Sequence, residues 1–331
     1  MNSKNSLFRL GIFLFVLVTG IGAAFCNELP SWNDTAAKRE ILNFVERTTT
    51  EGSPDYLPRD QRISVFDNDG TLICEQPIYI QFAFALNRVK ELAPTKPEWI
   101  NKEPFTAALD GRMNGNGLTH EDQNRDFAKL VWSTSENQAA GDLAIAVWDW
   151  LDRAENPSLK KPYQKTVYLP MRELLEFLRS KGFQTYIVSG GGSEFVRAYS
   201  QKFYGIPPEQ IIGSQAKMAF VERNGRHEVV MESEPEYFTN GPAKPFAIVR
   251  NIGKRPVLAF GNSDGDLEML LWTTTGVGPR LGLLLHHDDE KREFAYDRAS
   301  VVGRLDKALD EAKKRNWRVV SMKNDWKQVF P

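Results

Sequence analysis

Hydrophobic and polar positions follow two patterns along the chain: short apolar runs and longer segments with helical spacing. Apolar runs predict buried strands at 62–66, 184–188 and 256–260. Apolar residues three and four apart predict helices at 36–48, 171–181 and 194–203. Asn33 or Asp34 is available to cap the first helix, and Gly182 is well placed to end the second. Strands that alternate with helices predict an α/β fold with a Rossmann-like, doubly wound parallel sheet.

Residues 78–165 have a different character from the rest of the chain. They are rich in aromatic residues, show helical spacing near 81–92 and 138–153, and carry few strand signals. We therefore predict a mostly helical cap inserted after the first strand. The expected organisation is a signal peptide, an N-terminal helix with the first core strand, the cap, and the remainder of the core, at 1–26, 27–77, 78–165 and 166–331.

A hairpin is predicted within the second part of the core. The apolar runs at 217–221 and 228–231 flank Asn224-Gly225. This dipeptide favours the tight turn that joins two antiparallel strands.

The N-terminus has the order of a secretory signal peptide. Lys4 and Arg9 precede an apolar run at 10–18, and small residues follow up to Ala24. We expect export, to a bacterial periplasm or a similar space. Two alternatives stay open: an uncleaved membrane anchor, because the run approaches the length of a membrane span, and a lipoprotein attached through Cys26.

Composition and charge narrow the class of protein. The chain has 331 residues, with 42 Lys and Arg against 43 Asp and Glu, which are ordinary globular proportions. A net charge of -1 gives no long-range field for a polyanion, so no nucleic-acid partner is expected. Cys26 and Cys74 cannot form a disulfide framework. The sequence leaves the oligomeric state open.

The three predicted strands each end in a polar loop. Ligands of open α/β sheets bind at the carboxyl ends of the strands, so the three loops are expected to form one site. Carboxylate, hydroxyl and amide oxygens of this kind suit Mg²⁺. The candidate residues, in the order of the three strands, are Asp67 and Asp69, then Ser189 and Gly190, and then Asn262, Asp264 and Asp266.

These loops resemble the motifs of a known family. Asp67-Asn68-Asp69-Gly70-Thr71-Leu72 resembles the first motif of the haloacid dehalogenase-like (HAD) hydrolase superfamily, and Ser189 resembles the second. Lys244 is the best candidate for the third, and 261–266 resembles the acidic fourth. The motifs stand in the family's order. The helical cap brings the chain closest to the phosphoserine-phosphatase-like branch.

The resemblance implies a mechanism and a cofactor. Asp67 would be the nucleophile that forms an aspartyl-phosphate, and Asp69 the general acid and base. Ser189, the backbone N–H of Gly190 and Lys244 would hold the phosphoryl group. Mg²⁺ would be bound by the Asp67 carboxylate, the Asp69 carbonyl and the fourth motif, for which both Asn262 and Asp266 are candidates. The implied protein is an exported, Mg²⁺-dependent phosphomonoesterase for small phosphorylated metabolites.

Asn262 departs from the family pattern, which has an aspartate here. Either Asn262 is a neutral ligand supported by Asp266, or Asp264 or Asp266 takes over the coordination. The departure keeps a second function open: a catalytically impaired relative that binds phosphorylated ligands. A third is phosphoryl transfer to an acceptor other than water.

Three further features have two interpretations each. Glu75 is a candidate substrate-binding residue for an amine, or forms a structural salt bridge. Lys244 is part of the site or a solvated surface lysine. His286, His287, Asp288 and Asp289 look like a metal cluster, but neighbouring histidines of a strand face opposite sides, which favours a structural role.

Overall fold

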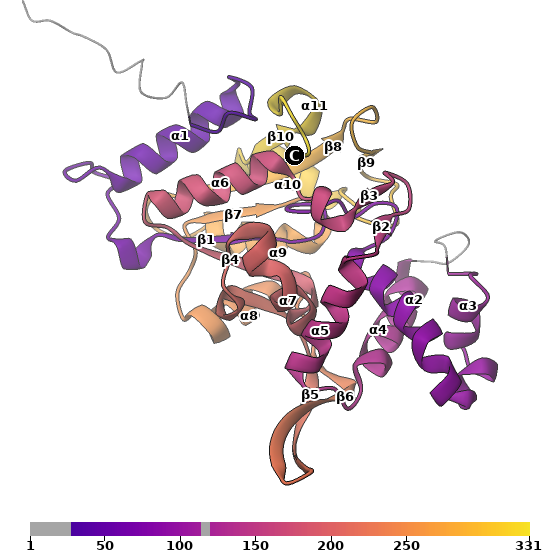
Figure 1. Cartoon of the computed structure of the whole chain (residues 1–331). Helices are drawn as coiled ribbons and strands as arrows, with labels where there is room; N and C mark the ends of the chain where they lie inside the picture. The colour runs from indigo at the N-terminus through magenta and orange to yellow at the C-terminus, as the bar shows by residue number, and fades with distance from the viewer. Residues whose placement is uncertain (1–27, 114–119) are drawn as a thin grey trace, which may run out of the picture.

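The computed structural model describes residues 28–113 and 120–331 (Figure 1). The predicted signal peptide lies outside the described residues, as does part of a glycine-rich loop at 111–117. None of the helices in the described ranges combines the length and the hydrophobicity needed to cross a bilayer.

A mostly parallel sheet forms the centre of the molecule. In the described ranges its order is β10-β8-β7-β1-β4-β5-β6, with β9 paired to β8. The strands are β1 (Ile63–Phe66), β4 (Gln184–Gly192), β5 (Ile211–Arg223), β6 (Arg226–Tyr237), β7 (Leu258–Gly261), β8 (Leu281–Asp288), β9 (Ala295–Tyr296) and β10 (Arg318–Ser321). Pairings are parallel from β10 to β5, whereas β6 and β9 are antiparallel to their neighbours. The predicted fold class is therefore confirmed.

Helices cover both faces of this sheet, because its central strands are apolar on both sides. Val65 belongs to the core on one face, and Phe66 to the core on the other. The Phe66 face packs against α1 (Ala36–Thr49), α6 (Leu169–Ser180) and α7 (Ser193–Tyr204). The Val65 face packs against α8 (Ala243–Ile252), α9 (Leu267–Thr274) and α10 (Lys307–Arg315). Figure 1 shows α1 and α6 together above the sheet.

The order of the strands locates the place where a ligand is expected. β1 lies between β4 and β7, and both pair with it in parallel. The chain thus leaves β1 to one side through the cap and later returns to its other side. The carboxyl ends of β1, β4 and β7 meet at this switch in direction, which is the usual binding position in doubly wound sheets.

The insertion after β1 consists mainly of helices. Its helices are α2 (Ile80–Leu92), α3 (Phe105–Leu109), α4 (His120–Ser135) and α5 (Ala140–Leu151). A two-stranded pair, β2 (Glu155–Asn156) and β3 (Lys161–Pro162), leads back to the core. We refer to α2–α5 as the cap helices.

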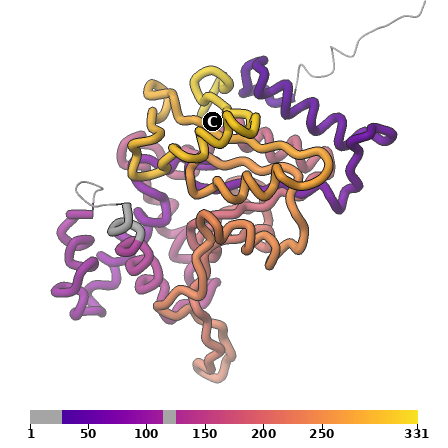
Figure 2. The backbone as a smooth tube through the Cα atoms, turned by 180° about the vertical axis from the view of Figure 1, so that it is seen from behind, coloured from indigo at the N-terminus to yellow at the C-terminus, as the bar shows by residue number. Residues whose placement is uncertain are grey.

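The hairpin of β5 and β6 extends beyond the sheet and joins the cap helices. Its turn has Asn224 and Gly225 at positive φ, 53° and 73°, as the sequence predicts for this dipeptide. In the part of the hairpin that lies past the parallel strands, Met231 of β6 exchanges backbone hydrogen bonds with Asn137 and Gln138, which connect α4 to α5. Both views of the chain show the hairpin projecting next to the cap helices (Figures 1 and 2). Strand β6 of the core is therefore in direct contact with the segment that joins α4 to α5.

Two local predictions are wrong. Thr35, and not Asn33 or Asp34, precedes the first turn of α1, and it makes no side-chain capping hydrogen bond. Asn33 instead donates to the carbonyl of Asn324, and Asp34 pairs with Arg39, so both side chains are engaged elsewhere. The second error is the end of β4, which continues to Gly192 with a break in register after Val188.

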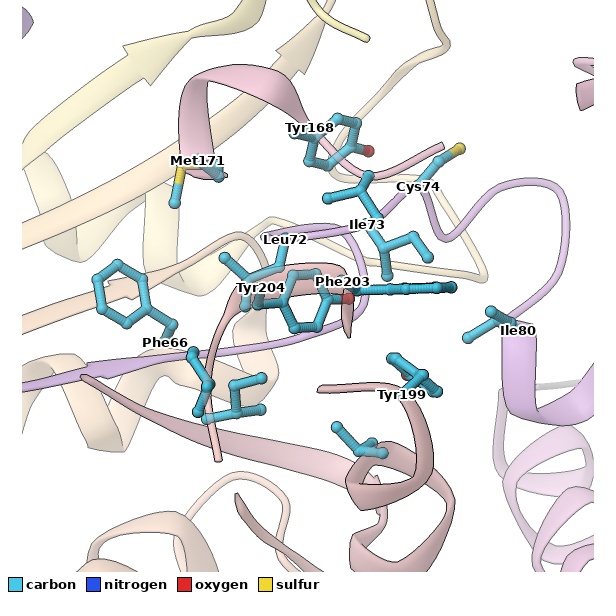
Figure 3. Close-up of a cluster of buried hydrophobic side chains, with 14 of the residues drawn as sticks. Phe66, Leu72, Ile73, Cys74, Ile80, Tyr168, Met171, Tyr199, Phe203 and Tyr204 are labelled. Atoms are coloured by element: carbon cyan, nitrogen blue, oxygen red, sulfur yellow. The ribbon is translucent and has the colours of Figure 1, made fainter. Parts of the chain in front are cut away.

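The loop that follows β1 rests on a dense apolar cluster. Leu72, Ile73 and Cys74 are fully buried beneath it. Figure 3 shows these side chains beside Tyr168 and Met171 at the start of α6 and Tyr199, Phe203 and Tyr204 of α7. Cys74 is a free thiol among the described residues. This packing supports the backbone of the loop from below.

Core packing predicts the stability of one pair of variants. Leu174 of α6 is fully buried, whereas Glu176 of the same helix is exposed. Leu174→Ala should lower the free energy of unfolding by about 2–5 kcal/mol, because it removes apolar contact and leaves a cavity. Glu176→Ala should change it by less than about 0.5 kcal/mol. Urea denaturation of both variants measures the difference, and equal losses would contradict this description of the core.

Candidate active site

The three strand ends meet around one cavity of about 1010 Å³ between the sheet and the cap helices. The structure brings together the residues that the sequence placed in three separate loops. Those that line this cavity are Asp67, Asp69, Glu75, Ser189, Gly190, Lys244 and Asp264. Asn262 and Asp266 are buried directly behind them.

Lys244 is a buried lysine at the centre of the site. It lies in the first turn of α8, and its side chain is 2 % exposed. Its Nζ donates to Asp67 Oδ1 at 2.6 Å, to Asp266 Oδ1 at 2.6 Å and to the carbonyl of Val188 at 2.8 Å. Burial disfavours its charge, but the two carboxylates more than offset this and raise the pKa of Lys244. The solvated-surface interpretation is therefore wrong.

Both carboxylate oxygens of Asp266 accept hydrogen bonds from neighbouring groups. One carboxylate oxygen accepts from Lys244, and the other accepts from the backbone N–H groups of Asn262 and Ser263 and from the Ser263 hydroxyl. Asp264, the other candidate, accepts from two backbone N–H groups near the start of α10. Both arrangements that the sequence left open stay predictions; the contacts of Asp266 are those expected of a residue that supports Asn262 from behind.

Asp67 and Asp69 have unusual acidities. Burial raises the pKa of Asp67 to about 7, with a further increase from Asp266 that Lys244 partly offsets. Burial raises the pKa of Asp69 to about 6, against a hydrogen bond from Asn68. Asp69 Oδ1 has no hydrogen-bond partner in the described ranges, although it is buried. Such an atom is costly unless a ligand contacts it.

The loop that follows Val188 borders the cavity. Ser189 is buried, and its hydroxyl accepts from the N–H of Gly191 at 3.0 Å. Gly192 donates its N–H to Gln81 Oε1 of α2 at 2.8 Å. Because the strand leaves its register after Val188, Gly190 and Gly191 are released from pairing and face the cavity.

Glu75 lies at the floor of the cavity. Its Oε1 accepts from Asn262 Nδ2 at 2.7 Å and from the Tyr296 hydroxyl at 2.8 Å. Burial is the main reason that the pKa of Glu75 is raised, and the Tyr296 hydrogen bond counteracts it. Both of these partners are neutral, and no ion pair of Glu75 is seen in the described ranges. The structural salt-bridge alternative is thus not supported, and substrate binding stays a prediction.

His287 supports the first loop from below. Its Nε2 contacts the carbonyl of Gly70 at 2.8 Å, and its Nδ1 contacts Glu293 Oε2 at 3.1 Å. Glu293 also accepts from Cys74 and Tyr168. No group of three or more His, Cys, Asp or Glu side chains in the described ranges is arranged as a metal cluster. The structural interpretation of the histidine pair is therefore correct for His287.

Several supporting residues were missed by the sequence analysis. Gln81 binds the second loop, Thr71 donates to Asn262 Oδ1 at 3.0 Å, and Tyr296 binds Glu75. Tyr199 and Tyr204 hold the side chain of Asn68. Thr71 lies inside the first motif and was the one that could have been found. The others come from distant segments, and no local pattern marks them.

Comparison with known proteins agrees with this geometry. A family model described as haloacid dehalogenase-like hydrolase matches residues 64–271. Among curated proteins no match was found. The chain is similar in fold to a protein of unknown function from Anaerococcus prevotii, with 15% identity, a TM-score of 0.53 and coverage of 86% of this chain and 91% of that one. It also matches a protein of unknown function from Bordetella pertussis, with 15% identity, a TM-score of 0.48 and coverage of 78% and 98%.

The chain belongs to the haloacid dehalogenase-like hydrolases, because the family model covers well over half of it. The predicted superfamily and the predicted hydrolase class are thereby confirmed.

The residues fit the Mg²⁺ that the family implies. Mg²⁺ uses one or two carboxylates and keeps several waters, so it needs no dense cluster of acidic side chains. Asp67 lines the cavity, and Lys244 occupies only one lone pair of its Oδ1, so this carboxylate keeps acceptor capacity for a cation. The Asp67 carboxylate, the Asp69 carbonyl and the Asn262 amide oxygen make a set of hard oxygen donors. We name these three as the residues that would hold the ion.

The acidity of Asp69 predicts how stability depends on pH without metal. Because its folded pKa, about 6, exceeds the ordinary 3.8, the folded state binds this proton more tightly. Its contribution is complete below about pH 4 and is lost as the pH rises to 6. Relative to Asp69→Asn, the free energy of unfolding of the wild type should fall by on the order of 3 kcal/mol over this range. Urea denaturation in EDTA measures this.

Asp289 supplies a control of opposite sign. Burial raises the pKa of Asp289, but Arg292 more than offsets this, and the net shift is downward. Relative to Asp289→Asn, the wild type should gain stability as the pH rises through 3.8. A wild-type protein that does not weaken relative to Asp69→Asn between pH 4 and 6 would refute the raised pKa of Asp69.

Proposed function

We propose that this protein is an exported, Mg²⁺-dependent phosphomonoesterase that hydrolyses small phosphorylated metabolites through an aspartyl-phosphate on Asp67. One observation carries the proposal. Asp67 is bound to the buried ammonium group of Lys244, and Asp69, two residues away, presents a buried oxygen without a partner in the described ranges. A nucleophilic carboxylate beside an acid–base carboxylate is the arrangement that this reaction needs.

Asp67 is held in place for attack on phosphorus. Lys244 fixes one oxygen and favours the ionised form, so the other oxygen can form the bond to phosphorus as the bond to the leaving oxygen breaks. A carboxyl with a pKa of about 7 keeps an ionised fraction at neutral pH. When bound, Mg²⁺ would offset the negative charge of Asp67 and of the phosphoryl oxygens.

Asp69 has the acidity of a proton donor. With a pKa of about 6 it still carries a proton in part of the molecules near neutral pH. It would give that proton to the leaving oxygen and take one back from the water that hydrolyses the aspartyl-phosphate. Ser189 and the N–H of Gly190 would hold phosphoryl oxygens, because both border the same cavity.

The cavity supports small substrates. Its volume lies at the upper end of the range of small-molecule sites, and the cap helices contribute apolar walls through Val131 and Trp132. Arg304 and Lys307 are exposed cations on its lining. This combination favours a small anionic metabolite with an apolar portion.

Asp67→Asn should abolish turnover, because an amide cannot form the acyl-phosphate. We expect phosphate release from p-nitrophenyl phosphate and a panel of small phosphomonoesters to fall by more than about 10³-fold. The control is Asp289→Asn, which removes a buried carboxylate that is not part of the cavity lining and should keep turnover. Hydrolysis by Asp67→Asn at the wild-type rate would refute the assignment of the nucleophile.

Asp69→Asn should affect substrates unequally. General acid catalysis contributes roughly 10²–10⁴-fold when the leaving oxygen needs a proton. p-Nitrophenolate leaves without one, so its phosphate ester should retain much more activity than an alkyl phosphate. The ratio is measured on the first turnover, as the rapid release of p-nitrophenol or of the alkyl alcohol with and without Mg²⁺, because the later hydrolysis of the aspartyl-phosphate also uses Asp69 and slows both esters alike. An equal loss on both esters would show that Asp69 does not protonate the leaving group.

A second function has one observation in its favour, the neutral Asn262 in place of an acidic metal ligand. An impaired relative would bind phosphate or vanadate tightly and release no phosphate from any ester with Mg²⁺ or Mn²⁺. Turnover on any ester in the panel excludes this alternative. Transfer to an acceptor other than water would appear as a phosphorylated product in place of free phosphate.

Export is proposed from the order of charged, apolar and small residues between Lys4 and Ala24. Expression of the full chain in a bacterium should give a periplasmic protein whose mass corresponds to cleavage near Ala24 or Cys26. Cell fractionation and intact-mass spectrometry test this. A full-length protein in the membrane fraction would indicate the anchor, and a lipid-modified Cys26 would indicate the lipoprotein.

A further inference from the structure

Asn262 is held by two hydrogen bonds of opposite kind. Its Oδ1 accepts from the Thr71 hydroxyl at 3.0 Å, and its Nδ2 donates to Glu75 Oε1 at 2.7 Å. The residue is 1% exposed, so water does not compete for these groups. The amide is therefore fixed in one of its two possible orientations.

The carboxyl group of Glu75 occupies a space that two glycines leave for it. A Cβ atom on Gly70 would lie 2.2 Å from Glu75 Oε1, and one on Gly303 would lie 1.9 Å from it. Both glycines have positive φ, 76° and 66°, which other residues rarely adopt. Tyr296, from β9, adds a third support by donating its hydroxyl to the same oxygen. The chain thus encloses this carboxyl from the neighbouring first motif and from the distant segment that contains Tyr296 and Gly303.

We propose that Glu75 is a positioning residue for the metal site, which restores through Asn262 the carboxylate that the fourth motif lacks. This inference rests on the Mg²⁺ dependence proposed above. A carboxylate can only accept hydrogen bonds, so Nδ2 must face Glu75, and Oδ1, the atom able to bind a cation, must face the loop of Asp67 and Asp69. A bound cation would favour the ionised form of Glu75, whose negative charge then lies one hydrogen bond behind the neutral ligand.

The arrangement predicts that Asn262→Asp alone does not improve the site. The new carboxylate would face Glu75 at the present 2.7 Å contact, where two like charges repel, and a hydrogen bond could join them only if one carboxyl kept a proton and so gave up its charge. Exchanging both residues, Glu75→Gln with Asn262→Asp, removes the conflict. The glutamine amide would then donate to the aspartate, and the carboxylate would be the direct ligand.

The test is a double-mutant cycle on metal affinity. Mn²⁺ is titrated into the purified mature protein, and free ion is measured by electron paramagnetic resonance, so the readout does not depend on turnover. Partners behind a metal ligand typically change affinity by 10–100-fold, and we expect about tenfold or greater weakening in Glu75→Gln. Asn262→Asp should also bind more weakly, and the double variant should return to within about threefold of the wild type. Glu290→Gln, which alters an exposed glutamate, is the matched control and should not change affinity.

The outcomes separate this inference from the proposed function. A wild-type protein that does not bind Mn²⁺ overturns both. Wild-type binding that Glu75→Gln leaves unchanged overturns the inference alone, and a weakened affinity for substrate in that variant would show that Glu75 contacts the substrate. Tighter binding by Asn262→Asp than by the double variant overturns it as well. If Glu75→Gln does not fold, as judged by circular dichroism, the comparison of Asn262→Asp with the double variant decides.

Discussion

The buried ammonium group of Lys244 is the interaction on which the rest of the site depends. It joins the ends of three neighbouring strands, because its partners are Asp67 after β1, the Val188 carbonyl of β4 and Asp266 after β7. Breaking a buried ion pair by removing one partner leaves an uncompensated charge and is strongly destabilising. The three loops are therefore held at a fixed separation before any ligand binds.

This constraint explains why Asp266, the last aspartate of the fourth motif, is hydrogen-bonded by the protein itself. Asp266 balances Lys244 and organises the turn that contains Asn262 and Ser263. Four donors thus hold the carboxylate of Asp266 in a supporting position. If the neutral Asn262 is the metal ligand, as we propose, the hydrogen bonds that orient its amide matter more than they would for an acidic residue at this position.

The sequence predicted the parts of the site that lie directly after strands. Asp67, Ser189 and Asn262 follow apolar runs, and the parallel pairing of these runs is enough to bring their ends together. The partners of Glu75 and of the second loop were not predictable, because Tyr296 and Gln81 reach them from segments whose approach depends on the complete fold. The N-cap of α1 was predicted wrongly for the same reason, because Asn33 donates a hydrogen bond to the distant Asn324. Local patterns gave the strand ends, and long-range contacts decided the rest.

The contacts of Glu75 with Tyr296 and Gly303 determine how late the site can form during synthesis of the chain. Tyr296 lies 221 positions after Glu75, so the floor of the cavity is missing until the last part of the chain has been made. A nascent chain that carries both aspartates of the first motif still lacks the lysine of α8 and the strand β9. Contacts of such long range form late, because closing a long loop is costly in entropy. An incomplete chain therefore carries the carboxylates of the first motif without the lysine and the tyrosine that complete the site.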